Sequence, residues 1–276
     1  MCIMKLKGLE QPKIKRMGDN RMIKKIGLQL YSIRDYMKTA EEMRASFRRL
    51  KDMGYDEAQT AGSGGVTYTE LAEIAKETGI EIVGTHYSWD DMHNNFEQTL
   101  ADHRAMGTTN CGIGGQFGLS SESATKNFIE AANKIADKLY DNGLKFTYHN
   151  HSHEFVKIND KDTIWDLLVE GLDPVKTSFV LDTCWVQQGG ADVRHWIELL
   201  KGRVDILHLK DVGRRGGDKP LFFTEIGNGN LWWEGIIESA VNSGVKHYCV
   251  EQDGEWLYND PFKSLEISSK FLHKFM

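Results

Sequence analysis

Residues 142–155 read NGLKFTYHNHSHEF, and the order of residue types in this stretch indicates the fold. Gly143 is typical of a helix end, because glycine readily takes the left-handed conformation that closes many helices. The run from Leu144 to His149 is rich in residues that favour a β-strand. Three histidines and a glutamate lie within or directly after this strand, which is where barrel enzymes place their chemistry.

The same order of helix end, glycine and strand recurs along the whole chain. The expected strands are residues 26–31, 56–60, 80–86, 109–114, 144–149, 177–182, 204–210 and 246–251. The expected helices are residues 39–53, 67–78, 94–106, 121–141, 163–170, 193–200, 232–243 and 261–275. The sequence therefore contains eight strand–helix units.

Repeated alternation of this kind predicts parallel strands with right-handed crossovers, and eight units is the number that closes a barrel. An open doubly wound sheet would carry a glycine-rich phosphate turn, but the GSGG at residues 62–65 lacks the G-x-G-x-x-G spacing. We expect it to be a flexible loop at the barrel mouth. The predicted fold is α/β, a single (β/α)8 TIM barrel over residues 23–276, preceded by a poorly structured extension at residues 1–22.

Composition excludes several classes of partner. The net charge of −6 disfavours nucleic acid, whose phosphates are bound by clustered lysine and arginine. Since no apolar run is long enough to span a membrane, we expect a cytoplasmic protein without a membrane partner. Four cysteines lack any C-x-x-C spacing and are expected to be buried thiols: Cys2, Cys111, Cys184 and Cys249.

Polar residues at the carboxyl ends of the last four strands should meet, because these ends converge at one mouth of a barrel. The strands lead in turn to Glu154, Asp182, His208 and Glu251. Three carboxylates brought together repel one another unless a cation lies among them. We therefore predict that these four residues bind one divalent metal ion. One imidazole with three carboxylates and no thiolate favours Mn²⁺, with Mg²⁺, Co²⁺ or Zn²⁺ as alternatives.

Six motifs resemble a known family, and they occur in the same order as in that family. They are GLQLYSIRD (27–35), YHNHSHEF (148–155), FVLDTCW (179–185), HLKD (208–211), EIGNGNLWWEGII (225–237) and VEQD (250–253). The chain, from Lys25 to its C-terminus, is similar to the sugar phosphate isomerase/epimerase family with the xylose isomerase-like TIM barrel. In ketose 3-epimerases of that family, Glu, Asp, His and Glu at the same strand ends bind one divalent cation. The resemblance implies that Glu154 and Glu251 are catalytic, as an acid–base pair on opposite faces of the substrate.

The chain also departs from the epimerase pattern. Trp185 stands where those enzymes carry a second substrate-contacting histidine, and Gln59 stands near the place of a glutamate. Several further polar groups at the strand ends indicate a second acid or base, as a lyase or dehydratase would need. The residues expected to contact substrate are His86, His149, His151, Trp185, Lys210, Asp211, Arg214 and Trp256.

The first functional hypothesis is a metal-dependent isomerase or epimerase of a sugar, sugar phosphate or related polyol, which removes a proton next to a carbonyl through a metal-stabilised enediolate. The alternative is a lyase or dehydratase of a 3-keto-glycoside or inosose that uses the same metal site. An apurinic endonuclease-like repair enzyme and a non-catalytic sugar-binding protein fit less well. The expected partner is a small carbohydrate, and a homo-oligomer is left open.

Overall fold

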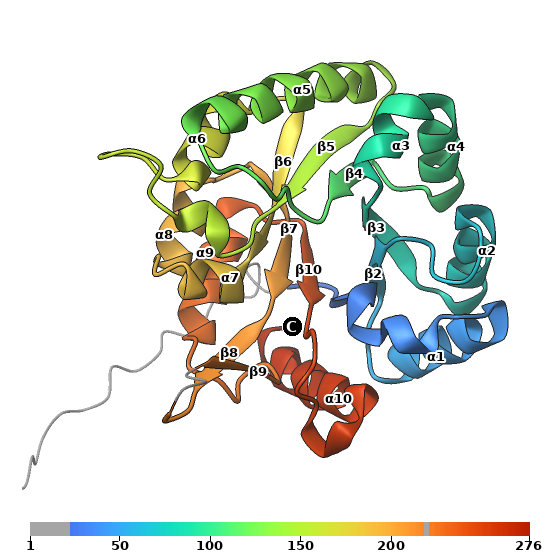
Figure 1. The fold of residues 1–276 in the computed structure, drawn as a ribbon. Coiled ribbons are helices and arrows are strands. Elements are labelled where there is room, and N and C mark those ends of the chain that lie inside the picture. The colour runs from blue at the N-terminus through green and yellow to red at the C-terminus, as the bar shows by residue number, and fades with distance from the viewer. Residues whose placement is uncertain (1–22, 218–220) are drawn as a thin grey trace, which may run out of the picture.

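Eight parallel strands form a closed barrel in the computed structural model, which describes residues 23–217 and 221–276 (Figure 1). The strands are β1 (Gly27–Gln29), β2 (Glu57–Ala61), β3 (Glu81–His86), β4 (Asn110–Ile113), β5 (Lys145–His149), β6 (Thr177–Asp182), β7 (Val204–Leu209) and β10 (His247–Val250). The barrel closes because β1 pairs with both β2 and β10. The prediction of a TIM barrel is confirmed. The predicted extension at residues 1–22 lies outside the described residues.

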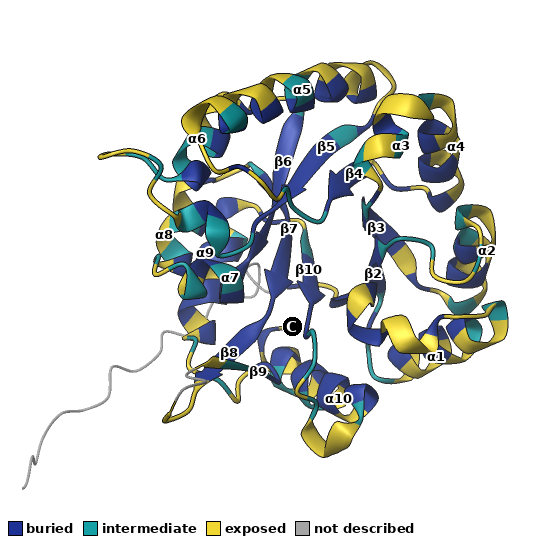
Figure 2. Cartoon of the chain, viewed as in Figure 1, coloured by how far each residue is buried: buried dark blue, intermediate teal, exposed yellow. Residues whose placement is uncertain are grey.

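Helices surround the barrel, with exposed outer faces and inner faces packed on the buried strands (Figure 2). They are α1 (Ala40–Asp52), α2 (Tyr68–Thr78), α3 (Trp89–Asn94), α4 (Phe96–Met106), α5 (Glu122–Asp141), α6 (Ile164–Gly171), α7 (Thr183–Gln188), α8 (Val193–Leu199), α9 (Trp233–Ser243) and α10 (Pro261–Leu272). Short 3-10 turns lie at η1 (Leu30–Tyr36), η2 (His153–Phe155), η3 (Leu257–Asn259) and η4 (His273–Phe275). The short helices α3 and α7 were not predicted. No described helix is both long and apolar enough to cross a membrane.

Local sequence explains where these helices begin and end. The Thr67 hydroxyl caps the N-terminus of α2 while the Glu70 carboxylate accepts the Thr67 backbone N–H, which is a capping box. The helix ends at Gly79, whose φ of +73° is the left-handed conformation that glycine adopts without a steric penalty. The chain can then enter β3 directly.

Two loops add detail that the sequence did not give. In the GSGG segment, which we expected to be a flexible loop, a Cβ at Gly65 would lie 1.8 Å from the Lys38 carbonyl oxygen, whereas a Cβ at Gly62 would meet no atom within 4 Å. After β7, the chain forms an antiparallel hairpin of β8 (Asp211–Arg214) and β9 (Leu221–Thr224), which the sequence pattern did not reveal.

Of the four cysteines, Cys111, Cys184 and Cys249 are buried free thiols, as predicted, and Cys2 lies outside the described residues.

Asp211 anchors this hairpin to the loop that follows it. Its carboxylate accepts hydrogen bonds from the backbone N–H groups of Gly227 and Gly229 at 2.8 and 3.1 Å. It also accepts from the backbone of Val212 at 2.8 Å and from the indole N–H of Trp233 at 2.7 Å. These hydrogen bonds hold the hairpin against the loop, and the expected contact of Asp211 with substrate stays a prediction.

Candidate metal centre

A cavity of about 370 Å³ opens at the carboxyl ends of the barrel strands. Its lining includes His86, His149, Trp185, Lys210 and Glu251. A larger groove of about 650 Å³ lies on the outer surface beside α5, where its lining consists mostly of exposed helix residues. Because buried imidazoles and carboxylates from several strand ends converge at the barrel-end cavity, we place the site there.

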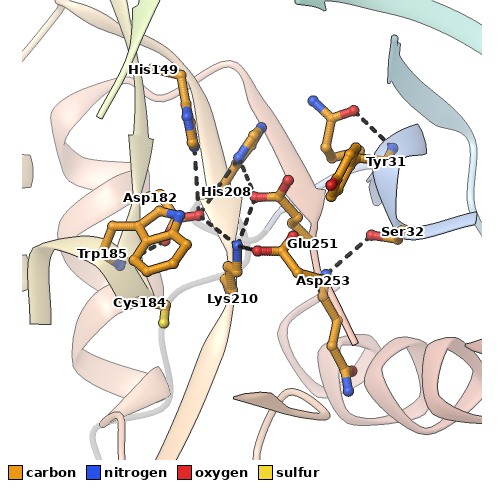
Figure 3. Close-up of polar contacts among 12 residues, drawn as sticks. Tyr31, Ser32, His149, Asp182, Cys184, Trp185, His208, Lys210, Glu251 and Asp253 are labelled. Atoms are coloured by element: carbon orange, nitrogen blue, oxygen red, sulfur yellow. Dashed lines mark hydrogen bonds and ion pairs between the residues drawn. The ribbon is translucent and has the colours of Figure 1, made fainter. Parts of the chain in front are cut away.

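Four buried side chains from four strand ends form the centre of this site (Figure 3). His149 ends β5, Asp182 ends β6, His208 lies in β7 and Glu251 directly follows β10. Each offers one nitrogen or oxygen atom, and these atoms all lie within 4.8 Å of one another. The Nδ1 atom of His208 is 3.0 Å from Glu251 Oε2 and 3.8 Å from Asp182 Oδ2.

Neighbouring backbone groups fix which atoms face the centre. Asp182 caps α7, so its Oδ1 accepts the backbone N–H of Trp185 at 2.9 Å. Its Oδ2 is left to face the centre. The Nδ1 atom of His149 lies 3.3 Å from the carbonyl oxygen of Gly114, which can only accept a hydrogen bond. His149 therefore carries its proton on Nδ1 and presents the lone pair of Nε2.

Lys210 lies among the carboxylates of the site. Its side chain is 1% exposed, and Nζ lies 2.6 Å from Asp253, 3.3 Å from Glu251 and 3.9 Å from Asp182. The Trp185 ring covers the ammonium at 4.5 Å. Three carboxylates thus face one ammonium, an excess of acidic groups that further positive charge would offset.

The pKa shifts follow from this imbalance. Burial would raise the pKa of Glu251, but the positive charges of Lys210 and His208 hold it well below its usual range. Burial opposes a charge on His208, yet Glu251 and Asp182 raise the pKa of that imidazole to about 9. The site therefore favours bound positive charge, whether it is a proton or a cation.

The donor set fits a divalent metal ion. His149 Nε2 and Asp182 Oδ2 are buried, lie 3.6 Å apart and have no hydrogen-bond partner among the described residues. A lone pair and a carboxylate oxygen that face each other in this way are stabilised by a proton or a metal ion between them. Two imidazoles and two carboxylates suit a first-row divalent ion such as Mn²⁺, Co²⁺ or Zn²⁺. Their arrangement is consistent with one such ion.

Glu154, which we predicted to be both a metal ligand and a catalytic residue, does not belong to this group of four. Its Oε1 accepts the Tyr148 hydroxyl at 2.8 Å, and its Oε2 accepts the backbone N–H of His151 at 2.8 Å. It lies instead in a second group with His151 and His153. The reason is geometric: the chain leaves the barrel after His149, and η2 turns Glu154 back against Tyr148. His149 takes the strand-end position, a role that its place as the last residue of β5 could have indicated.

The predicted substrate contacts fall into two groups. His86, His149, His151, Trp185 and Lys210 line the cavity. The other three lie elsewhere: Asp211 anchors the hairpin, Arg214 is exposed at the end of β8, and Trp256 lines an adjacent pocket with Ser32 and Arg34. Asp253, the partner of Lys210, was not among the predicted site residues.

Comparison with known proteins gives consistent matches. The family model of the xylose isomerase-like TIM barrel matches residues 47–274. Inosose dehydratase from Geobacillus thermodenitrificans (strain NG80-2) is 30% identical over 217 residues, which cover 71% of this chain and 67% of that protein.

Two solved structures share the fold at low sequence identity. A sugar phosphate isomerase/epimerase from Parabacteroides distasonis ATCC 8503 has a TM-score of 0.77 at 24% identity, over 91% of this chain and 98% of the other. The structure of IOLI protein with a binding zinc atom has a TM-score of 0.68 at 13% identity, over 92% of this chain and 99% of the other.

Proposed function

The chain belongs to the family of xylose isomerase-like TIM barrels, and on that basis we propose that it is a divalent-metal-dependent lyase. Its substrate is a keto sugar, a 3-keto-glycoside or a cyclic keto-polyol. The enzyme removes a proton next to the carbonyl and expels a hydroxyl or another oxygen substituent from the β-carbon. One observation carries the choice of a lyase: Glu251 is the glutamate that lines the cavity, whereas Glu154 is engaged by Tyr148 and His151.

The cation would be held by His149, Asp182, His208 and Glu251. When bound, it supplies a Lewis acid that polarises the carbonyl and makes the adjacent C–H group more acidic. Carbonyl and hydroxyl oxygens on adjacent carbon atoms of a sugar-like substrate suit such an ion. The aromatic face of Trp185 supplies an apolar wall for the carbon skeleton of the substrate and restricts water.

A single carboxylate can carry out the elimination. The contacts of Glu251 to His208 and Lys210 both use Oε2, so Oε1 is the atom assigned to proton removal. As the C–H bond breaks, its electron pair forms the C=C bond and the C–O bond at the β-carbon breaks. Glu251 returns the same proton to the departing hydroxyl, which leaves as water. The Lys210 ammonium, beside Glu251, donates a hydrogen bond to the departing oxygen.

An isomerase is the second candidate. It shares the first step, and the proton then returns to a carbon atom instead of leaving with the hydroxyl. The Parabacteroides distasonis structure described as a sugar phosphate isomerase/epimerase supports this alternative. Epimerisation would need a second acid on the opposite face of the substrate, and His86 and His151 are further titratable groups in the cavity lining.

A substrate panel separates the two reactions. Inososes, 3-keto-glycosides and keto sugars are assayed in D2O with Mn²⁺, Co²⁺, Zn²⁺ or Mg²⁺, and with a chelator as control. A lyase gives a product lighter by one water or one alcohol. An isomerase gives a product of unchanged composition that carries deuterium. Turnover that persists in excess chelator, after removal of bound metal, would contradict both candidates.

A further inference from the structure

A chain of buried and partly buried hydrogen bonds connects the start of η1 to two histidines of the site. It runs from the backbone N–H of Tyr31 through the amides of Gln29 and Gln59 to His208, with a branch from Gln29 to His86. Both glutamines are completely buried and come from adjacent strands, β1 and β2. The donor and the acceptor of each hydrogen bond follow from the first group in the chain, the Tyr31 backbone N–H.

The backbone N–H of Tyr31 can only donate a hydrogen bond. Its partner at 3.2 Å is therefore the oxygen of the Gln29 amide, and the Gln29 NH2 group must face the other way. That NH2 group lies 3.0 Å from the Gln59 amide. Since an amide N–H needs an acceptor, the atom that Gln59 presents is its oxygen, Oε1.

The orientation of Gln59 determines the proton position on His208. Gln59 Oε1 lies 2.5 Å from His208 Nε2, and an oxygen that only accepts requires a proton on that nitrogen. Nδ1 is then the nitrogen that would give up its proton and offer a lone pair to a metal ion. Nδ1 is also the atom that faces Glu251 and Asp182.

The branch to His86 fixes a second imidazole in the same way. The Gln29 NH2 group lies 3.3 Å from His86 Nδ1, which must accept, so His86 carries its proton on Nε2. Nε2 is buried and has no hydrogen-bond partner among the described residues, and His86 lines the cavity.

We propose that Gln29 and Gln59 are positioning residues that set the tautomers of two site histidines. His208 is held with Nδ1 as its metal-binding atom, and His86 is held with an Nε2–H group that donates to a carbonyl or hydroxyl oxygen of the substrate. The part that concerns His86 and substrate rests on the proposed function. The part that concerns the two tautomers rests on the hydrogen-bond chain alone.

Gln29→Glu reverses this chain at nearly constant volume. The introduced carboxylate accepts on both sides, so Gln59 turns its NH2 group toward it and toward His208. His208 Nε2 must then accept, so the imidazole keeps its proton on Nδ1, the metal-facing atom. His86 Nδ1, which faces the carboxylate, becomes protonated. The matched control Gln29→Met removes the polar atoms of this side chain without reversing the donor and acceptor roles of its neighbours.

The test reads the tautomers by side-chain ¹⁵N NMR and the metal affinity by calorimetry with Zn²⁺ alone. We expect a proton on Nε2 of His86 in the metal-free wild type, and on Nδ1 in Gln29→Glu. Outer-sphere partners of metal ligands typically contribute about 10–100-fold in affinity, and we expect a loss of this size for Gln29→Glu and a smaller one for Gln29→Met. A second pair of variants tests Gln59. Gln59→Glu keeps an acceptor for His208 Nε2–H, so we expect it to retain the Zn²⁺ affinity. Gln59→Met removes this acceptor, so we expect it to lose the Zn²⁺ affinity.

Two results would overturn the proposal. One is a proton on Nδ1 of His86 in the wild type. The other is an unchanged tautomer and Zn²⁺ affinity in Gln29→Glu, with circular dichroism showing that the variant is folded. Neither readout uses turnover, so the absence of lyase and isomerase activity across the substrate panel would reject the proposed function and leave the tautomer assignment standing.

Discussion

His149 Nε2 lies 3.6 Å from Asp182 Oδ2, and neither atom has a hydrogen-bond partner among the described residues. A lone pair on Nε2 would repel this carboxylate oxygen, and because the Gly114 carbonyl holds the Nδ1 proton in place, only a second proton or a metal ion can make the contact favourable. A cation between them removes the conflict. This relationship, more than the count of acidic residues, supports a cation at the candidate metal centre.

The contrast between His149 and Glu154 is directly testable. His149→Ala should abolish stoichiometric metal binding, because it removes one of the four converging donors. Glu154→Gln should retain one metal ion per chain, because that side chain lies in a different group. Metal content after dialysis, measured by mass spectrometry, checks both variants. Loss of the ion in Glu154→Gln with retention in His149→Ala would restore the ligand set expected from the sequence.

Lys210→Met should destabilise the metal-free protein. The ammonium is 1% exposed and contacts Glu251 and Asp253, so its removal leaves buried carboxylates without their compensating charge. Breaking one side of a buried ion pair typically costs about 3–5 kcal/mol. Urea unfolding in the presence of chelator measures the change, with Lys134→Met on the exposed face of α5 as the control. Added Mn²⁺ should recover part of the loss, and equal stability of the two variants would contradict the role assigned to Lys210.

The sequence was sufficient for the barrel because each unit carries local signals. The strand at residues 177–182 was predicted with the bounds of β6, and the predicted end of the helix before β3 is confirmed at Gly79. The β8–β9 hairpin could not be predicted, because it depends on Asp211 collecting N–H donors from residues 16 to 22 positions later. The positions of Asp182, His208 and Glu251 in the group of four were predicted from the strand ends. The presence of His149 in that group in place of Glu154 depends on how η2 turns the chain after β5.

The pH dependence of stability should include a contribution from His103, which lies away from the metal centre. Burial lowers the pKa of this imidazole, whose Nδ1 donates to the Thr99 carbonyl at 2.7 Å. The unfolded chain therefore binds a proton below pH ~6.5 that the folded chain does not, and stability falls as the pH falls through this range.

Urea unfolding of metal-free protein between pH 7 and pH 5 measures this effect. One proton taken up on unfolding changes the unfolding free energy by about 1.4 kcal/mol per pH unit. We expect a shallower pH slope for His103→Gln than for the wild type, whatever the absolute stability of the variant. Identical slopes would show that His103 titrates alike in both states.

Asp211→Asn should weaken the fold without emptying the metal centre. The carboxylate accepts hydrogen bonds from Val212, Gly227, Gly229 and Trp233, whereas an amide presents an NH2 group where one oxygen accepted. Leaving a buried donor unsatisfied costs about 1–3 kcal/mol. Thermal unfolding tests the effect on stability, and Zn²⁺ calorimetry tests metal binding. The unfolding temperature should fall, while the protein should still bind one Zn²⁺ ion per chain. If the variant kept its stability and lost turnover, Asp211 would contact substrate, as the sequence alone had indicated.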